Sequence, residues 1–284
     1  MEKRIALLVV GLIGVCFFSS TVLALSPMGP PKASLGQNQW AVGIDYANGT
    51  MDLEASSTIN ETIIHVPDPP AVAKRRDAKH KIKDLKSNII MGRVGYGISD
   101  NWDAFVRLGI ADGKDDIDQI YPDSATHQFK GFDGDFGFAW GFGTKATFWE
   151  DYKITWGGLF QITWLDPDDG DISLSGDPEF SATADIDFWE VQIALGPTWQ
   201  AYDNLSVYGG PFLHFLNGDL DISGKGVDMG DESRMEISGD IEEESQFGGF
   251  VGASWDVRKD ISCYLEGQIT GDAWGIGIGA VRRF

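Results

Sequence analysis

The sequence predicts an all-β protein in which about ten antiparallel strands close into an up-and-down transmembrane β-barrel. Three observations favour this fold class. Apolar residues alternate with small or polar residues along many short segments, tight turns alternate with long connections, and tryptophans cluster toward the ends of the expected strands. After residue 24, no apolar run reaches the roughly eighteen residues of a membrane-spanning helix, which excludes a helical multi-pass membrane protein.

Composition narrows the function classes. The 284 residues include 22 Lys and Arg against 43 Asp and Glu, which gives a formal net charge of -21. A phosphate backbone favours a basic surface, so a general nucleic-acid-binding protein is excluded. The hydrophobic fraction of 43% is ordinary for a folded chain and excludes disorder throughout.

The N-terminus has the pattern of a secretory signal peptide. A short charged region at 1–4 precedes an apolar stretch at 5–18, and Val22-Leu23-Ala24 forms a small-residue cleavage pattern. We therefore expect cleavage after Ala24 and export. The chain then divides into a signal peptide at 1–24, an N-terminal extension at 25–36 and a transmembrane barrel at 37–284.

Each expected strand repeats a period of two, which places one face toward lipid and the other toward the lumen. In the first strand, Trp40, Val42, Ile44 and Tyr46 share the apolar face. The ten segments lie near residues 40–47, 87–98, 102–111, 136–142, 152–164, 189–199, 205–215, 245–257, 261–270 and 274–284.

The connections between these strands alternate in length. Tight turns are expected at 99–101, 150–151, 202–204 and 258–260, and only the connection near 271–273 breaks the alternation by being short. Short turns on one side and long loops on the other are typical of transmembrane barrels, with the turns periplasmic and the loops extracellular. The long connections are expected at 48–86, 112–135, 166–185 and 217–244.

The last segment resembles the final strand of bacterial outer-membrane β-barrels, such as the porin-like and small-barrel classes. Apolar residues recur at every second position from Trp274, and the chain ends in Phe284. Arg282 departs from the pattern, because an apolar residue is more usual there. The resemblance implies the outer membrane as location, lipid and lipopolysaccharide as surroundings, and recognition of Phe284 by the barrel-assembly machinery. It also implies a monomer.

Tryptophan placement supports the same interpretation, because amphipathic rings prefer the two membrane interfaces. Trp140 and Trp156 are expected deeper in the membrane. The inner belt is expected from Trp40, Trp102, Trp149, Trp199 and Trp255, and the outer belt from Trp164, Trp189 and Trp274.

The strand parity predicts a polar lumen of mixed charge. Arg93 and Arg107 fall opposite each other across the turn near Asp100, so carboxylates must compensate them, and Glu190 and Glu266 are the available inward partners. The lumen is then either a structural plug of ion pairs or a charge-selective constriction. The residues expected to line it are Arg93, Arg107, Lys145, Glu190, His214 and Glu266.

Three of the long connections are acidic, whereas 74–86 is strongly basic. The basic stretch is either a solvated loop, a partner for the acidic loops, or a contact for lipopolysaccharide phosphates. Fragments at 220–223 and 234–240 in the fourth connection resemble a hairpin, which either extends the barrel wall or adds strands.

A weak site for Ca²⁺ or Mg²⁺ is expected in the third long connection, where oxygen ligands are offered by Asp166, Asp168, Asp169 and Asp171. Their spacing is not that of an EF-hand.

An enzyme is not expected. Some outer-membrane barrels are rim proteases, and His214 facing Asp112, Asp115 and Asp116 is the one arrangement here that resembles their site. The close Asp-x-His pair is missing, because Phe212 occupies its place. We therefore expect a narrow porin-like channel for small solutes or ions. The alternative is a plugged structural or surface-interaction barrel whose acidic loops bind an external partner or cations.

Overall fold

The structure is a computed structural model that describes residues 25–64, 72–120, 126–174, 180–228, 231–243 and 246–284. The expected signal peptide at 1–24 lies outside these residues. Within them, every regular element is a β-strand, and no helix is long and apolar enough to cross a membrane.

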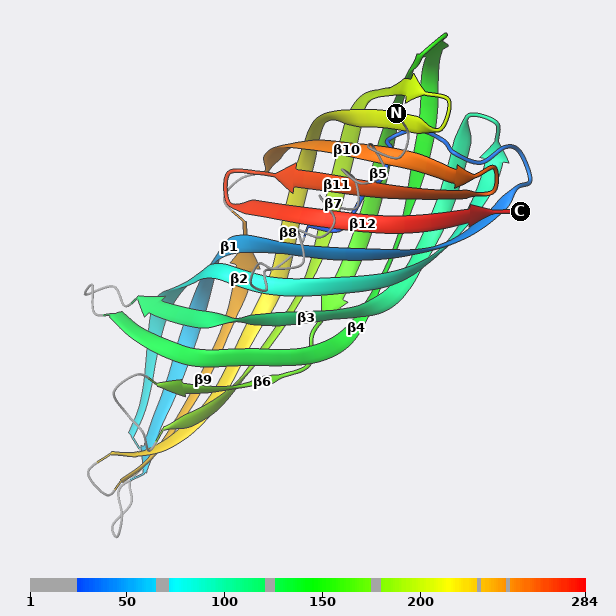
Figure 1. Ribbon diagram of the computed structural model, residues 1–284. Coiled ribbons are helices and arrows are strands. Elements are labelled where there is room, and N and C mark those ends of the chain that lie inside the picture. Colours follow the sequence, from blue (N-terminus) through cyan, green and yellow to red (C-terminus); the bar gives the residue numbers. More distant parts are fainter. Residues whose placement is uncertain (1–24, 65–71, 121–125, 175–179, 229–230, 244–245) are drawn as a thin grey trace, which may run out of the picture.

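The described strands form one sheet of twelve, and ten of them close into a ring. Chain neighbours pair antiparallel, and β12 pairs with β1 from Ala41 opposite Arg283 to Met51 opposite Ala273, so the wall has no free edge (Figure 1). The expected closed up-and-down barrel is confirmed. The ring contains β1 (Trp40–Ile64), β2 (Val72–Ser99), β3 (Trp102–Ile120), β4 (Thr126–Asp151), β5 (Ile154–Asp166), β7 (Ser181–Tyr202), β8 (Leu205–Asp228), β10 (Phe247–Arg258), β11 (Ile261–Ile269) and β12 (Ala273–Arg283).

The prediction of long loops is wrong over most of the residues concerned, because the strands continue through them. β2 has 28 residues and β1 has 25, whereas about ten residues suffice to cross a bilayer. Two further strands, β6 (Gly170–Leu174) and β9 (Asp231–Glu242), join only this outer part. β6 lies between β4 and β7, and β9 lies between β8 and β1.

A second closed ring of strands lies beyond the membrane-spanning ring, and we call it the extension, as distinct from the N-terminal extension at 25–36 (Figure 1). It consists of the outer parts of β1, β2, β3, β4, β7 and β8 together with β6 and β9. The fragments at 220–223 and 234–240 belong to the extension and lengthen the wall, as one of the two alternatives predicted. The second fragment lies in β9, which adds one strand to the extension but none to the membrane-spanning ring. The polar composition of these segments suggested loops, but their polar residues point outward and alternate with buried apolar ones.

The outer surface changes character along β7. Trp189, Ile193 and Leu195 point outward and are exposed, as expected for a lipid-facing belt, whereas the next outward positions toward the extension are Asp187 and Asp185. The inner surface changes in the opposite sense, so the membrane-spanning ring has a polar interior and the extension has an apolar one.

Tryptophans contribute to the exposed apolar belt at both ends of the membrane-spanning ring. Trp40, Trp102 and Trp199, beside the tight turns, are about half exposed. Near the other end, Trp140 is the cross-strand neighbour of Trp164 and stacks on it with ring centroids 4.1 Å apart. The prediction that Trp140 lies deeper than Trp164 is therefore wrong. These side chains face outward, where interfacial rings are expected.

Candidate functional site

The structure places all six residues expected to line the lumen inside the ring. The arginine side chains come from β2 and β3, Lys145 from β4, Glu190 from β7, His214 from β8 and Glu266 from β11. None of the six is more than 8% exposed. The alternation of side chains along each strand therefore suffices to place them.

The N-terminal extension does not lie beside the barrel but runs through its lumen. Leu25 lies at the extension end, near Gly275, and the backbone N–H of Gln37 donates to Asp100 in the turn between β2 and β3. Leu25 and Met28 are fully buried. We call residues 25–37 the lumen segment. Its three prolines lack the N–H groups that a wall strand needs, and the segment forms no strand of the sheet. Its backbone turns at Gly29, where φ is 67°.

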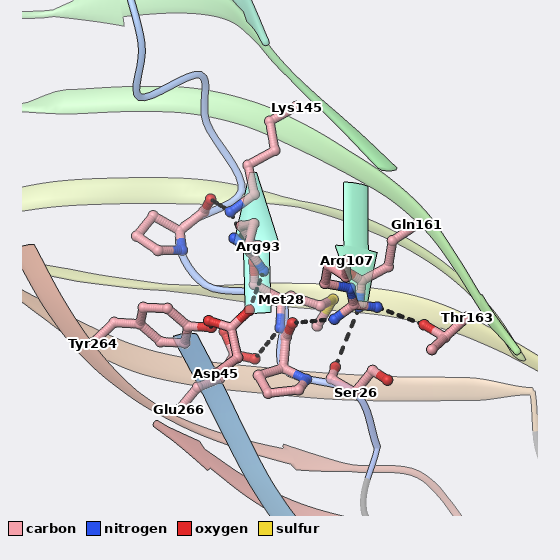
Figure 2. A network of polar contacts seen from close by, with 12 residues as sticks. Ser26, Met28, Asp45, Arg93, Arg107, Lys145, Gln161, Thr163, Tyr264 and Glu266 are labelled. Carbon is pink, nitrogen blue, oxygen red and sulfur yellow. Dashed lines mark hydrogen bonds and ion pairs between the residues drawn. The ribbon is translucent and has the colours of Figure 1, made fainter. Parts of the chain in front are cut away.

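Cationic and amide side chains of the wall donate to carbonyl oxygens of the lumen segment (Figure 2). Lys145 Nζ lies 2.7 Å from the Met28 oxygen and 2.9 Å from the Pro30 oxygen. Arg107 Nη1 donates to the Pro27 oxygen at 3.3 Å. Two glutamine amides, Gln161 and Gln268, donate to the Ser26 oxygen at 3.3 and 3.0 Å.

Acidic and hydroxyl side chains accept from the backbone N–H groups of the same segment. Glu266 Oε1 accepts from Met28 at 2.9 Å, and Asp103 Oδ2 accepts from Ser34 at 2.7 Å. Thr147 Oγ1 accepts from Ala33 at 3.1 Å. The lumen therefore holds a peptide segment, and several of its backbone N–H and carbonyl groups have partners on the wall.

Arg93 and Arg107 are direct cross-strand neighbours, as the sequence predicts. The compensating carboxylate is different from the expected ones. Arg93 Nη2 lies 3.1 Å from Asp45 Oδ2, and the Tyr264 hydroxyl donates to the other Asp45 oxygen at 2.6 Å. Asp45 takes this role because β1 pairs directly with β2, whereas Glu190 and Glu266 stand on strands farther around the ring.

Arg107 is neutralised less directly. Its Nη2 donates to Thr163, and its Nη1 donates to the lumen segment. The centroid of the Phe105 ring lies 4.5 Å from the guanidinium carbon of Arg93 and 6.0 Å from that of Arg107. A cation near the face of an aromatic ring is stabilised by it, so this ring helps to compensate both charges. Thr163 was not singled out from the sequence, although its inward parity could have identified it.

His214 bonds to two carboxylates at the extension end of the lumen. Its Nε2 lies 3.0 Å from Glu190, and its Nδ1 lies 2.5 Å from Glu243. Gln192 is the cross-strand neighbour of His214, but its amide donates to Gln268. Glu243 follows β9 and was missed, because strand parity does not extend into the connection that carries it.

The arrangement expected for a rim protease does not form around His214. Both nitrogens of its ring are bonded to glutamates. Asp112 accepts instead from the backbone and side chain of Asn88. The side chains of Asp115 and Asp116 lie outside the described part of the structure.

The four aspartates proposed as cation ligands are not brought together as a ligand set. Asp166 ends β5, Asp168 and Asp169 follow it, and Asp171 lies on β6, all with exposed side chains. Among the described residues, no group of three or more His, Cys, Asp or Glu side chains is arranged to hold a metal ion.

The last residue lies at the turn end of the ring. The backbone N–H of Phe284 donates to the Trp40 oxygen at 2.8 Å, which continues the closing pair of strands. Its ring is 63% exposed, with the Arg282 guanidinium 5.0 Å away. The departure from the family pattern at Arg282 thus places a cation beside the terminal ring.

The outer surface of the extension has an acidic side and a basic side. Asp187, Asp219 and Asp240 are successive cross-strand neighbours on β7, β8 and β9. Partial burial and the neighbouring carboxylates raise the pKa of Asp187 and of Asp185. Lys79 and Lys83 on β2 lie on the other side, beyond β1. An outer groove of about 850 Å³ crosses β8, β9, β1 and β2 between the two sides.

The chain resembles solved outer-membrane barrels in architecture. The outer membrane protease OmpT from Escherichia coli aligns at 11% identity with a TM-score of 0.41, covering 86% of this chain and 94% of its own. OprG from Pseudomonas aeruginosa aligns at 9% identity with a TM-score of 0.40, covering 88% and 97%. No protein-family model matches the sequence, and no curated protein matches it.

The closed ring, the outward apolar belt and the polar lumen together decide the class. The chain has the architecture of a transmembrane β-barrel. A barrel of this class lies in a lipid bilayer, and its closure follows from the need to satisfy every backbone group in hydrocarbon. Its membrane-spanning ring and its extension therefore face two different environments.

Proposed function

We propose that this outer-membrane barrel is closed and anchors the extension, which presents its charged surface to an external partner. The observation that carries the proposal is the presence of two barriers in series. The lumen segment fills the polar lumen, and the interior of the extension beyond it is a packed apolar core.

The inward side chains of β2 illustrate the second barrier. From the extension toward the membrane, Ile82, Leu85, Ile89 and Met91 are buried before Arg93 reaches the polar lumen. An ion entering such an apolar core loses its hydration without gaining partners, which costs several kcal/mol or more. The closed barrel therefore needs no moving part to stop ion flow.

A narrow porin-like channel for small solutes or ions is the second candidate. The polar lining of the lumen favours it, because charged groups such as Arg93 and Arg107 are what a selective constriction requires. In this case the lumen segment is a gate that must leave before ions pass, and the core of the extension must also open.

Single-channel conductance in a planar bilayer separates the two candidates. The chain of residues 25–284 is refolded, and heat-modifiable gel mobility verifies the barrel. The closed barrel predicts no current steps. Discrete, reproducible steps that change in Arg93→Ala or Arg107→Ala would overturn the proposal in favour of the channel.

The proposal also covers the export, oligomeric state and assembly of the barrel. The leader at 1–24 is removed on export, the barrel is a monomer, and Phe284 is read by the barrel-assembly machinery. Deletion of Phe284 is expected to reduce assembly in vivo several-fold without changing refolding in detergent. Equal assembly of the variant and the native chain would remove Phe284 from this role.

The basic side of the extension is assigned to lipopolysaccharide phosphates in the same proposal. Lys79 and Lys83 are exposed on β2, and exposed cations near an anionic leaflet attract its phosphates. Lys79→Gln with Lys83→Gln is expected to weaken binding of lipopolysaccharide to the purified barrel, measured at low salt. Unchanged binding would remove the basic side from the proposal.

No step of the proposal is catalytic, so purified protein is expected to hydrolyse no peptide.

A further inference from the structure

Side chains of the lumen wall form hydrogen bonds with backbone groups of the lumen segment. Lys145, Arg107 and two glutamines donate to its carbonyl oxygens, while Glu266, Asp103 and Thr147 accept from its N–H groups. A wall that binds carbonyl and N–H groups in this way recognises a peptide chain whose backbone groups are not used in secondary structure of its own. It does not require a covalent connection to that peptide.

Prolines suit the narrow lumen for a physical reason. Pro27, Pro30 and Pro31 carry no N–H, so they bring carbonyl acceptors into the lumen without donors that need further partners. Their fixed φ also reduces the conformational entropy that the segment loses when it is ordered. The free-energy cost of burying a proline-containing peptide here is thus smaller than that of a peptide with an N–H donor at every position.

Glycines in the wall make room for the segment. A Cβ on Gly277 would lie 2.7 Å from Pro27 Cβ, and its three nearest neighbours all belong to Pro27. A Cβ on Gly157 would overlap the carbonyl oxygen of Pro31. The wall therefore has a track shaped to this peptide, in addition to polar groups directed at its backbone.

We infer that the lumen is a binding site for a single, proline-containing peptide chain, and that residues 25–36 are its tethered and replaceable ligand. A free peptide of the same sequence binds in trans when the tethered copy is absent. A short tether holds its ligand at an effective concentration on the order of millimolar, so the native chain is self-occupied. This inference goes beyond a closed barrel, because binding is independent of whether the barrel conducts.

The first test uses the chain 25–284 with all its segments. Ser26, fully buried in the lumen, is changed to Cys in a Cys263→Ser background, and its reaction with a maleimide is timed. Gly277→Val is expected to accelerate the reaction at least tenfold, because the new side chain overlaps Pro27. Gly267→Val is the matched control, since a Cβ on Gly267, in the neighbouring strand, meets nothing within 4 Å. Equal acceleration by both substitutions would overturn the site.

The second test measures binding directly. A fluorescein-labelled peptide of residues 25–37 is added to a variant that lacks residues 25–36, after heat-modifiable mobility verifies that the variant is folded. Saturable binding is expected, weakened at least tenfold by Gly277→Val and unchanged by Gly267→Val. A peptide of the reversed sequence controls for composition.

The outcomes distinguish this inference from the proposed function. A folded variant that binds neither peptide, or binds both equally, overturns the peptide site even if the barrel is silent in a bilayer. If the variant fails to fold, the labelling rates of the chain 25–284 decide alone. Current steps from a barrel that binds the peptide would overturn only the closed barrel.

Discussion

Glu266 on β11 accepts a hydrogen bond from the backbone N–H of Met28, a residue 238 positions earlier in the chain. The same carboxylate oxygen accepts from the Gln268 amide at 2.8 Å. One buried side chain of the last hairpin thus fixes the beginning of the described chain inside the barrel. The wall and the lumen segment consequently stabilise each other, and several predictions test this coupling and the extension beyond it.

Removal of the Glu266 acceptor should destabilise the barrel. Glu266→Ala leaves the Met28 N–H without its buried acceptor and removes one of the two acceptors of the Gln268 amide, which should lower the free energy of unfolding by about 1–3 kcal/mol. Glu266→Gln keeps an acceptor oxygen and should cost less. Urea unfolding in liposomes measures both. If Gln is as destabilising as Ala, the hydrogen bond to Met28 is not what Glu266 contributes.

The ion pair of Arg93 with Asp45 should show strong coupling. Asp45→Ala leaves the buried guanidinium of Arg93 without its counter-charge, and Arg93→Ala leaves the buried carboxylate of Asp45 without its own. Each variant should lower the free energy of unfolding by about 3–5 kcal/mol. The double variant should lose less than the sum. A double-mutant cycle on the free energy of unfolding checks this, and additive losses would show that the two charges act separately.

His80 should make the extension sensitive to acid. It is fully buried on β2, with Nε2 2.6 Å from Ser57 Oγ, and desolvation lowers its pKa from 6.5 to about 4. Between these values the unfolded chain binds the extra proton, so stability falls as pH falls from 6.5 toward 4, by up to about 3 kcal/mol. Hydrogen exchange of the β1 and β2 amides across this range measures the effect.

The control for this prediction is His80→Leu, which replaces the titrating imidazole with an apolar side chain. The pH dependence of exchange in the extension should become shallower by the contribution of one proton. Parallel pH profiles for the variant and the native chain would assign the acid sensitivity to other groups.

Neutralising one carboxylate of the acidic side should stabilise the extension at neutral pH. Asp187 has its pKa raised by partial burial and by Asp219, so its folded form holds a proton more tightly than the unfolded chain does. Stability therefore rises as pH falls through the raised pKa and is lower when the group is ionised. Asp187→Asn should gain less than about 1 kcal/mol, because the group is largely exposed and screened.

Salt provides the check on this electrostatic origin. The gain from Asp187→Asn should shrink as ionic strength rises toward 1 M, where the screening length falls to about 3 Å. A gain that is independent of salt would point to local backbone or packing effects instead. Thermal unfolding at two salt concentrations is sufficient to decide.

The sequence predicted the membrane-spanning ring because one physical pattern determines it. Each strand must present apolar residues to lipid at every second position, so parity alone placed Arg107 and Glu266 inside. The extension was predicted as loops because its outward residues, such as Asp219 and Lys79, are those of a solvated surface. Its inward residues, such as Ile222 and Ile82, carry the strand signal, and they become visible once both faces are considered.

The filling of the lumen could not be predicted from strand parity. Residues 25–36 show no periodicity, and their prolines and glycines indicate only an irregular chain. Their position depends on contacts with residues more than a hundred positions away, such as Lys145 and Gln268. The pairing of Asp45 with Arg93 instead of Glu190 likewise depends on which strands adjoin, which the order of the ring fixes.

The central claim is that the lumen segment occupies the lumen, and a crosslink tests it most directly. Ser26→Cys is combined with Gln268→Cys in the Cys263→Ser background, because the Gln268 amide nitrogen lies 3.0 Å from the backbone carbonyl oxygen of Ser26. A short bifunctional thiol reagent should join them in the membrane-embedded barrel, as identified by mass spectrometry of the digest. The pair Ser26→Cys with Asp203→Cys, in the turn between β7 and β8, should not be joined. Absence of the first crosslink in a folded barrel, or equal yields for both pairs, would contradict a lumen filled by the chain's own N-terminal segment.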